Sequence, residues 1–258
     1  LDWANFARKT VKNGAYAKYA FYDESIRDNL LEEKGLVSQM QEALNNGEFI
    51  VYYQPKVALR TGDIACAEAL VRWKKSDGQI IPPDKFIPIF EKNHLIAELD
   101  QYVFESVCRS LRRRLDEERP VLPVSVNISR LQFYEEDFVA AYAAVKNRYR
   151  LPNGLLDLEF TESIACDNFE LMTEIVKKLK QEGFSCSIDD FGKGYSSLSL
   201  LKSLPIDTLK IDRLFFIGGE NKERDAILVE SIIGLVRKLH IQTVAEGVES
   251  PDQVAFLK

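Results

Sequence analysis

Apolar residues follow two different periods along the chain. Between residues 24 and 46 they recur at roughly helical spacing, which predicts a helix, although Gly35 interrupts the pattern. From residue 49 the apolar residues form short runs instead. The runs at 49–54 and 64–71 flank the turn Thr61-Gly62-Asp63, so we expect two strands that pair as an antiparallel hairpin.

From residue 86 onward, short apolar runs alternate with longer stretches of helical period. Five of the short runs are predicted strands: 123–128, 156–161, 185–189, 207–211 and 242–246. Helices are predicted between them, for example at 97–116, 169–182 and 223–239. Gly183 follows the second of these helices at a position typical of a helix end. This alternation predicts a parallel sheet.

The predicted strands favour a (β/α)8 barrel of the TIM type, with the antiparallel pair first, and the length of the chain suits it. An open doubly wound sheet is the alternative, but no GxGxxG sequence follows any of the strands. Ser250 and Pro251 predict the start of a helix, yet only seven residues follow Pro251, too few for a settled helix. We therefore expect a fragment whose eighth strand would come after Lys258.

Composition narrows the class of function. The 258 residues carry a net charge of −6, which argues against a non-specific nucleic-acid binder. No apolar run approaches the ~18 residues that span a bilayer, so no membrane contact is expected within this chain. The four cysteines form no CxxC pair and fit a reducing cytoplasm. With only two histidines, any metal site must use mostly oxygen ligands.

Several predicted strands end in a carboxylate or an amide. These residues are Glu68, Asn127, Glu159, Asp189, Asp190 and Glu246. In a β/α barrel the carboxyl ends of the strands meet at one mouth, where active sites lie. The neighbours Asp189 and Asp190 can both reach that mouth only if their strand ends there, and Gly192 just downstream favours such a turn.

The convergent carboxylates require cations. Five of them would repel one another by several kcal/mol at an effective dielectric of about 20. Two divalent ions together with the ammonium group of Lys210 would balance their charge. The sequence therefore predicts a two-metal site of the kind that cleaves phosphodiesters.

Seven segments in one order carry a resemblance to a known family. They are Tyr53-Gln54-Pro55, Glu68-Ala69-Leu70-Val71-Arg72-Trp73, Asn127-Ile128-Ser129, Glu159-Phe160-Thr161-Glu162, Asp189-Asp190-Phe191-Gly192, Lys210-Ile211-Asp212 and Ala245-Glu246-Gly247-Val248-Glu249. From about residue 47 to 258 the chain resembles the EAL family of cyclic di-GMP phosphodiesterases. Residues 1–23 resemble the tail of a GGDEF domain (diguanylate cyclase-type), as in tandem GGDEF–EAL proteins, and 24–46 would be a linker helix.

The resemblance implies roles for the acidic residues and their neighbours. One metal would be held by Glu68, Asn127, Glu159 and Asp189, and a second, bridged by Asp189, by Asp190 and Glu246. Lys210 would orient or activate the attacking water through a lowered pKa, so that Lys210, Glu68 and Glu246 form the catalytic set. Arg72 would pair with a substrate phosphate, and substrate contacts would also come from Gln54, Leu70 and Asp190. Glu162 would anchor the loop that starts at Asp190.

The resemblance also implies an activity and partners. The first hypothesis is hydrolysis of cyclic di-GMP to linear pGpG with two Mg²⁺ or Mn²⁺ ions, in the cytoplasm or the cytoplasmic part of a membrane protein. The alternative is a catalytically weak or inactive receptor for cyclic di-GMP, and a purely structural dimerisation domain is third. A homodimer through this domain and a GGDEF-like domain in the same chain are expected. Lys193 replaces the usual Thr of the family, and the family's Gln-Gly-Tyr segment would lie beyond Lys258.

Overall fold

The computed structural model describes residues 24–193, 198–216 and 222–258. The helical pattern and the GGDEF-like tail predicted for 1–23 lie outside the described residues. The strands are β1 (Phe49–Val57), β2 (Ile64–Lys74), β3 (Ile80–Ile81), β4 (Val124–Asn127), β5 (Leu156–Thr161), β6 (Ser185–Phe191), β7 (Thr208–Ile211) and β8 (Gln242–Ala245). The helices are α2 (Glu24–Asn45), α3 (Pro83–Lys92), α4 (Ile96–Asp116), α5 (Phe138–Arg148), α6 (Glu162–Asp167), α7 (Phe169–Gln181), α8 (Leu198–Ser203), α9 (Lys222–Lys238) and α10 (Pro251–Leu257), with the short 3-10 helices η1 (Arg130–Tyr134) and η2 (Arg213–Phe215).

The described chain forms two compact units. The smaller one contains α2, β3 and α3, together with Phe49 and the segment Trp73–Leu95. Its core is a cluster of four buried rings, whose measured centroid separations run from 4.9 to 6.2 Å: Phe49, Trp73, Phe86 and Phe90. Such ring pairs stabilise a core beyond the area that they bury. Gly35 does not interrupt α2, which runs continuously through it.

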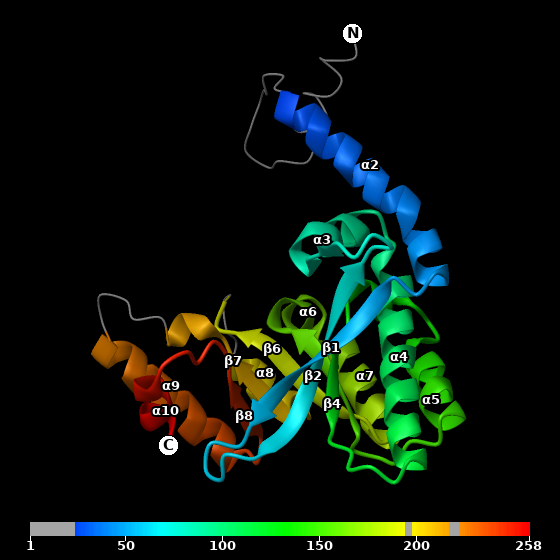
Figure 1. The fold of residues 1–258 in the computed structure, drawn as a ribbon. Coiled ribbons are helices and arrows are strands. Elements are labelled where there is room, and N and C mark those ends of the chain that lie inside the picture. The colour runs from blue at the N-terminus through cyan, green and yellow to red at the C-terminus, as the bar shows by residue number, and fades with distance from the viewer. Residues whose placement is uncertain (1–23, 194–197, 217–221) are drawn as a thin grey trace. The chain divides into compact units, whose positions relative to one another are not determined.

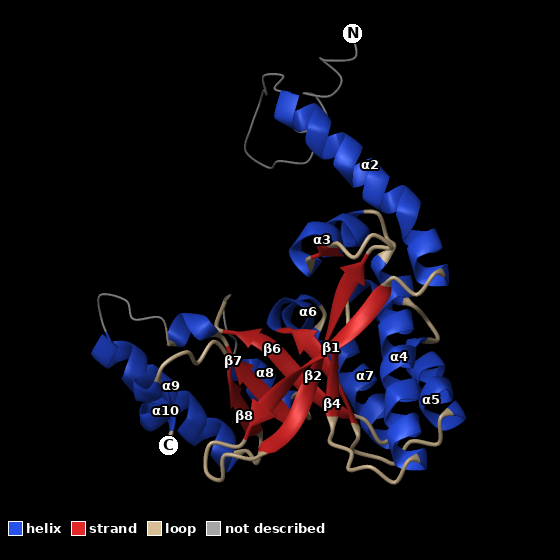
Figure 2. Cartoon of the chain, viewed as in Figure 1, coloured by secondary structure: helices blue, strands red, loops and turns tan. Residues whose placement is uncertain are grey.

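The larger unit contains Ile50–Arg72 and Ile96–Lys258, and it is built on one curled sheet (Figures 1 and 2). The strand order is β1-β2-β4-β5-β6-β7-β8, and every neighbouring pair from β2 to β8 is parallel. Strands β1 and β2 are adjacent and are joined by a tight turn in which Ala58 N donates to Asp63 O at 2.9 Å, so they run in opposite directions. The predicted α/β barrel-type sheet with an antiparallel first pair is confirmed.

The two faces of the sheet differ in chemistry. In β5 the apolar side chains of Leu156, Leu158 and Phe160 are fully buried, and the Phe160 ring packs on Phe133 of η1 with centroids 5.0 Å apart. Helices α4, α7 and α9 pack on β4, β6 and β8. Because side chains alternate along a strand, the opposite face of β5 carries Asp157, Glu159 and Thr161. The polar face of the sheet therefore holds the candidate chemistry.

Two helix boundaries follow the local sequence. Helix α7 ends before Gly183, whose φ of +82° and close approach to Asn153 leave no room for a side chain. Helix α10 begins at Pro251 after Ser250, as predicted. The expectation that the residues after Pro251 are too few for a settled helix is wrong. A capping box between Ser250 and Gln253 and a hydrogen bond from Gln253 Nε2 to Phe216 O hold this short helix.

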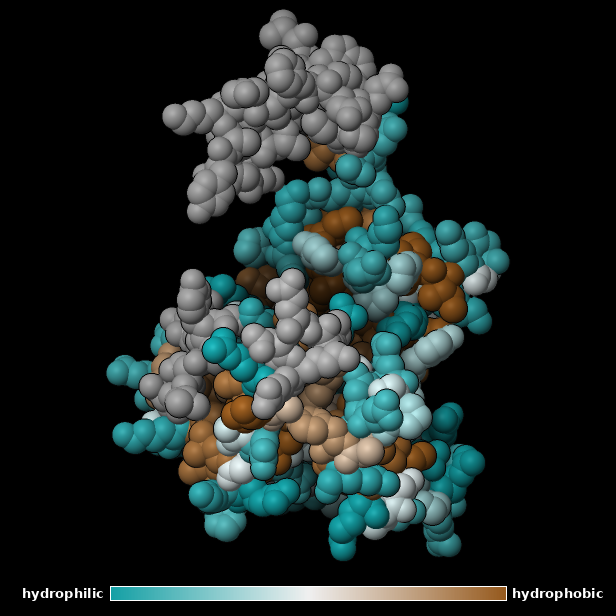
Figure 3. Space-filling view, turned by 90° about the vertical axis from the view of Figure 1, so that its left-hand side faces the viewer, coloured by the Kyte–Doolittle hydropathy of each residue, from teal (hydrophilic) through white to brown (hydrophobic). Residues whose placement is uncertain are grey.

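The surface near the last helices is partly apolar. Figure 3 shows hydrophobic side chains exposed among hydrophilic ones on the side that carries α9 and α10. The large exposed apolar residues of these two helices are Ile227, Leu228, Leu235 and Phe256, and Leu239 directly follows α9. None of the described helices combines the length and the low charge that a membrane crossing requires.

Candidate functional site

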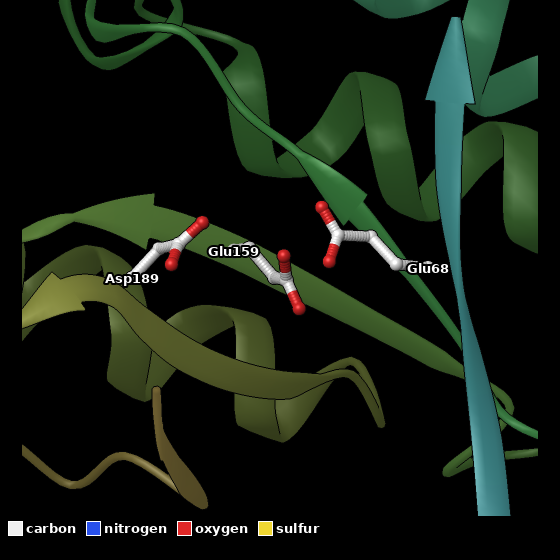
Figure 4. A group of neighbouring side chains, drawn as sticks. All are labelled: Glu68, Glu159 and Asp189. Carbon is white, nitrogen blue, oxygen red and sulfur yellow. The ribbon is translucent and has the colours of Figure 1, made fainter. Parts of the chain in front are cut away.

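The ammonium group of Lys210 is the centre of the acidic cluster. Its Nζ atom lies 2.7 to 3.1 Å from one oxygen of each of four carboxylates: Glu68, Glu159, Asp189 and Glu246. Lys210 is 1% exposed and Glu159 is also buried, so these are desolvated contacts. Figure 4 shows Glu68, Glu159 and Asp189 directed toward one common space.

The register of the parallel strands brings these residues together. Asn127 at the end of β4 is opposite Glu159 in β5, and Thr161 at the end of β5 is opposite Asp189 in β6. Glu246 follows β8, and its backbone N donates to Ile211 O at the end of β7. The cluster thus lies at the carboxyl ends of the strands, where the sequence predicted it.

Asp189 and Asp190 reach the cluster in a different way from the one predicted. Strand β6 does not end at Asp189 but continues to Phe191. A register shift between Ile188 and Phe191 marks a bulge, and Asp190 takes a left-handed conformation with φ of +59°. A bulge lets two successive residues point to one side of a strand. The expectation that the strand must end at Asp189 is therefore wrong.

A second lysine, not predicted from the sequence, supports the cluster from β1. Lys56 Nζ lies 2.5 Å from Glu159 Oε1, 2.8 Å from Ser125 Oγ and 3.8 Å from Glu68 Oε2. Lys56 and Gln54 are two positions apart, so alternation places them on one face of β1. This spacing from Gln54 could have indicated from the sequence that Lys56 faces the site.

The electrostatics of the cluster follow from burial and from the lysines. Burial acts to raise the pKa of Glu159, but Lys210 and Lys56 outweigh it and hold that pKa below its ordinary value. For Asp189 and Glu246, burial raises the pKa in spite of the opposing charge of Lys210. Burial alone would lower the pKa of Lys210, yet the surrounding carboxylates raise it. The predicted lowering of the Lys210 pKa is wrong for this arrangement.

The carboxylates form two overlapping groups that suit divalent cations. Glu68, Glu159 and Asp189 offer oxygens within 4.8 Å of one another, and so do Asp189, Asp190 and Glu246. Asp189 belongs to both groups, as a bridging ligand would. An all-oxygen donor set is the chemistry of Mg²⁺ and Mn²⁺ sites. The residues present therefore fit a two-cation site.

Of the remaining predicted residues, some bond to the residues of this cluster and others do not. Asn127 Nδ2 donates to Glu68 Oε1 at 2.9 Å, and the backbone N of Gly192 donates to Glu162 Oε2 at 2.9 Å. Arg72 shares a strand face with Glu68 and Leu70, and its guanidinium lies 5.7 Å from the centre of the Tyr52 ring. Gln54 lies in β1 and is exposed.

Fold and site define a β/α-barrel-type protein with a cluster of carboxylates on its sheet whose oxygens suit a divalent metal ion. The EAL domain family matches residues 37–258, and the chain belongs to that family.

Two curated relatives are similar along nearly the whole chain. The bifunctional diguanylate cyclase/cyclic di-GMP phosphodiesterase MucR of Pseudomonas aeruginosa is 37% identical over 97% of the chain. The cyclic di-GMP phosphodiesterase PdeR of Escherichia coli is 34% identical over 98% of it. The chain spans 36% and 38% of the length of these two relatives.

Solved structures agree with the fold. The structure described as "PaMucR Phosphodiesterase, c-di-GMP complex" has a TM-score of 0.80 and 38% identity, covering 86% of this chain and 90% of that one. A structure of the EAL enzyme Bd1971 in its cAMP and cyclic di-GMP bound form has a TM-score of 0.79 and 29% identity. It covers 97% of this chain and 65% of that one.

Proposed function

We propose that this chain is a metal-dependent phosphodiesterase that hydrolyses cyclic di-GMP to linear pGpG in bacterial second-messenger signalling. The observation that carries the proposal is the pair of carboxylate groups that share Asp189 around Lys210. The names of MucR and PdeR and the cyclic di-GMP complex of the MucR phosphodiesterase support the choice of substrate.

Two Mg²⁺ or Mn²⁺ ions are the proposed cofactors. Glu68, Asn127, Glu159 and Asp189 would hold one ion, and Asp189, Asp190 and Glu246 the other. When bound, such ions lower the pKa of water and stabilise charge on the phosphodiester oxygens. The carboxylates would contribute ligand oxygens from a rigid part of the fold, because each lies within a strand or directly after one.

Lys210 is proposed to position groups at the site rather than to act as a neutral base. Its four carboxylate contacts raise the pKa of its ammonium group, which donates hydrogen bonds to oxygens of Glu68, Glu159 and Asp189. An ammonium fixed at this point can orient a water molecule or a phosphate oxygen and stabilise negative charge in the transition state.

Substrate contacts are proposed along β1 and β2. Arg72 would pair with a phosphate, for which a guanidinium has matching geometry, and Gln54 and Leu70 would line the nucleotide groove. Asp190 would contact substrate as well as metal. Glu162 would hold the loop after Asp190 through its bond to the backbone of Gly192.

Wider features of the protein are also proposals. We expect the phosphodiesterase domain to span 47–258, to form a homodimer and to follow a GGDEF-like domain. Cys66, Cys108 and Cys186 form no disulfide among the described residues, which fits a cytoplasmic location.

The test is hydrolysis of cyclic di-GMP by the purified protein, followed by separation of the nucleotides. We expect pGpG to form with Mn²⁺ or Mg²⁺ and not after treatment with EDTA. Tight binding of cyclic di-GMP without turnover in either metal would favour the receptor alternative. Full turnover in metal-free buffer would refute the two-cation mechanism.

A further inference from the structure

Lys193, which follows the bulge of β6, contacts one of the two carboxylate groups. Its Nζ atom lies 2.5 Å from Asp190 Oδ1 and 3.2 Å from Asp212 Oδ2. The hydrogen bond that Lys193 Nζ donates to the carboxylate of Asp190 raises the pKa of Lys193. About half of the side chain is exposed, which leaves it room to move.

The backbone of Asp190 places its side chain beside the cluster. Asp190 takes a left-handed conformation within the bulge of β6, and a bulge re-aims a side chain of its strand. Its carboxylate belongs to the group with Asp189 and Glu246. A divalent cation in that group and the ammonium of Lys193 would therefore share the carboxylate of Asp190, whose Oδ1 atom Lys193 contacts.

Asp212 gives Lys193 an alternative partner. Asp212 is buried, and its Oδ1 atom accepts a hydrogen bond from Leu214 N at 2.8 Å, so its carboxylate has a fixed position. Lys193 can keep its contact with Oδ2 of Asp212 while it releases Asp190. No contact joins Lys193 to Glu68, Glu159 or Asp189 in the described structure, so its effect falls on one group only.

We propose that Lys193 is a built-in competitor for the second divalent cation, the one that Asp190 and Glu246 would hold. The ammonium contacts both Asp190 and Asp212 when the cation is absent, and it keeps only the contact with Asp212 when the cation binds. The competition weakens the binding of the second cation relative to that of the first. The fraction of protein with both cations bound therefore depends on the concentration of free metal. This inference rests on the two-cation site of the proposed function.

The test is calorimetric titration of Mn²⁺ into the metal-free protein, which measures binding without turnover. Lys193→Met keeps the apolar stem and removes the charge, Lys193→Thr removes both, and Lys193→Arg keeps a charge. Lys178→Met on α7 is the control, because it removes an equal charge from the outer groove that it lines with Phe138 and Ile175.

We expect the weaker of two binding events to tighten about tenfold in Lys193→Met and Lys193→Thr, which corresponds to about 1.4 kcal/mol. The affinity of the stronger binding event should stay near its wild-type value in these variants. In Lys193→Arg and Lys178→Met both affinities should stay near those of the wild type. The Mn²⁺ concentration for half-maximal turnover should fall in Lys193→Met and Lys193→Thr.

Unchanged or weaker Mn²⁺ binding in both neutral variants would overturn the competition, and so would an equal gain in Lys178→Met. These outcomes leave the proposed function intact. Absence of Mn²⁺ binding to every protein, the wild type included, would instead refute the two-cation site and the competition together.

Discussion

Replacing Lys210 by Met tests how much the acidic cluster depends on one ammonium group. The variant keeps a side chain of similar volume in a buried position and removes a charge that contacts four carboxylates. At an effective dielectric of about 20, opposite charges 2.8 Å apart attract by about 6 kcal/mol. Two carboxylates 4.8 Å apart repel by about 3–4 kcal/mol. Without Lys210 this repulsion is opposed only by Lys56, which contacts Glu159 and Glu68, and by Lys193, which contacts Asp190.

The loss of stability is limited by proton uptake. A cluster without its ammonium can bind a proton, and protonating one carboxyl of ordinary pKa at pH 7 costs about 3–4 kcal/mol. We therefore expect the free energy of unfolding to fall by about 3–5 kcal/mol, the range found when one partner of a buried ion pair is removed.

Urea unfolding followed by circular dichroism in EDTA measures this loss. The control is Lys180→Met, which breaks an ion pair with Asp207 whose two side chains are each more than a third exposed. That pair should contribute only about 0–1 kcal/mol. Mn²⁺ should recover part of the loss in Lys210→Met, because a cation bound to the folded state neutralises the same carboxylates. A loss no larger than that of the control would refute the idea that Lys210 balances the charge of the cluster.

Further predictions concern catalysis, the bulge and a buried thiol. Glu68→Ala should reduce turnover more than about 100-fold and Lys210→Ala by about 10²–10⁴-fold, while titration calorimetry still detects cyclic di-GMP binding to the Lys210 variant. Gly192→Ala should destabilise the protein by about 1–3 kcal/mol, since φ is +104° and the new Cβ would lie 2.0 Å from the Phe215 ring. A melting temperature equal to that of the wild type would contradict this. Burial raises the pKa of Cys108 to about 12, above its value in the unfolded chain, so the thiol stays protonated at pH 9. Alkylation mapped by mass spectrometry should therefore modify Cys108 only after unfolding, and the stability that this thiol contributes should decline as the pH rises above about 9.

The strands of the sheet could be predicted because each one is encoded by a local pattern of apolar residues. Each parallel strand is a short apolar run next to a helical stretch, and the predicted and observed bounds differ by a few residues at most. The two-residue strand β3 escaped prediction because two residues carry no period. The division into two units was not predicted either, because strand β2 is continuous in sequence where the units divide between Arg72 and Trp73.

The convergence of the carboxylates was predictable from the sequence, but their detailed contacts were not. Position at a strand end identified the carboxylates, since the parallel register brings such ends together. The bulge at Asp190 depends on the pairing of β6 with β7, which no local pattern encodes. The pKa of Lys210 depends on four residues from four other segments, so only the assembled structure reveals its direction.

The lysines change the reason why this site requires metal. If Lys210 were the only cation near the five carboxylates, four negative charges would remain uncompensated. The protein would then need divalent ions in order to fold. In the structure Lys56 contacts Glu159 and Lys193 contacts Asp190, so two uncompensated charges remain instead. The folding of this protein therefore depends less on divalent metal ions than its proposed catalysis does. The ammonium groups and the cations share the same carboxylates, so the contacts that stabilise the metal-free cluster also affect how tightly it binds metal.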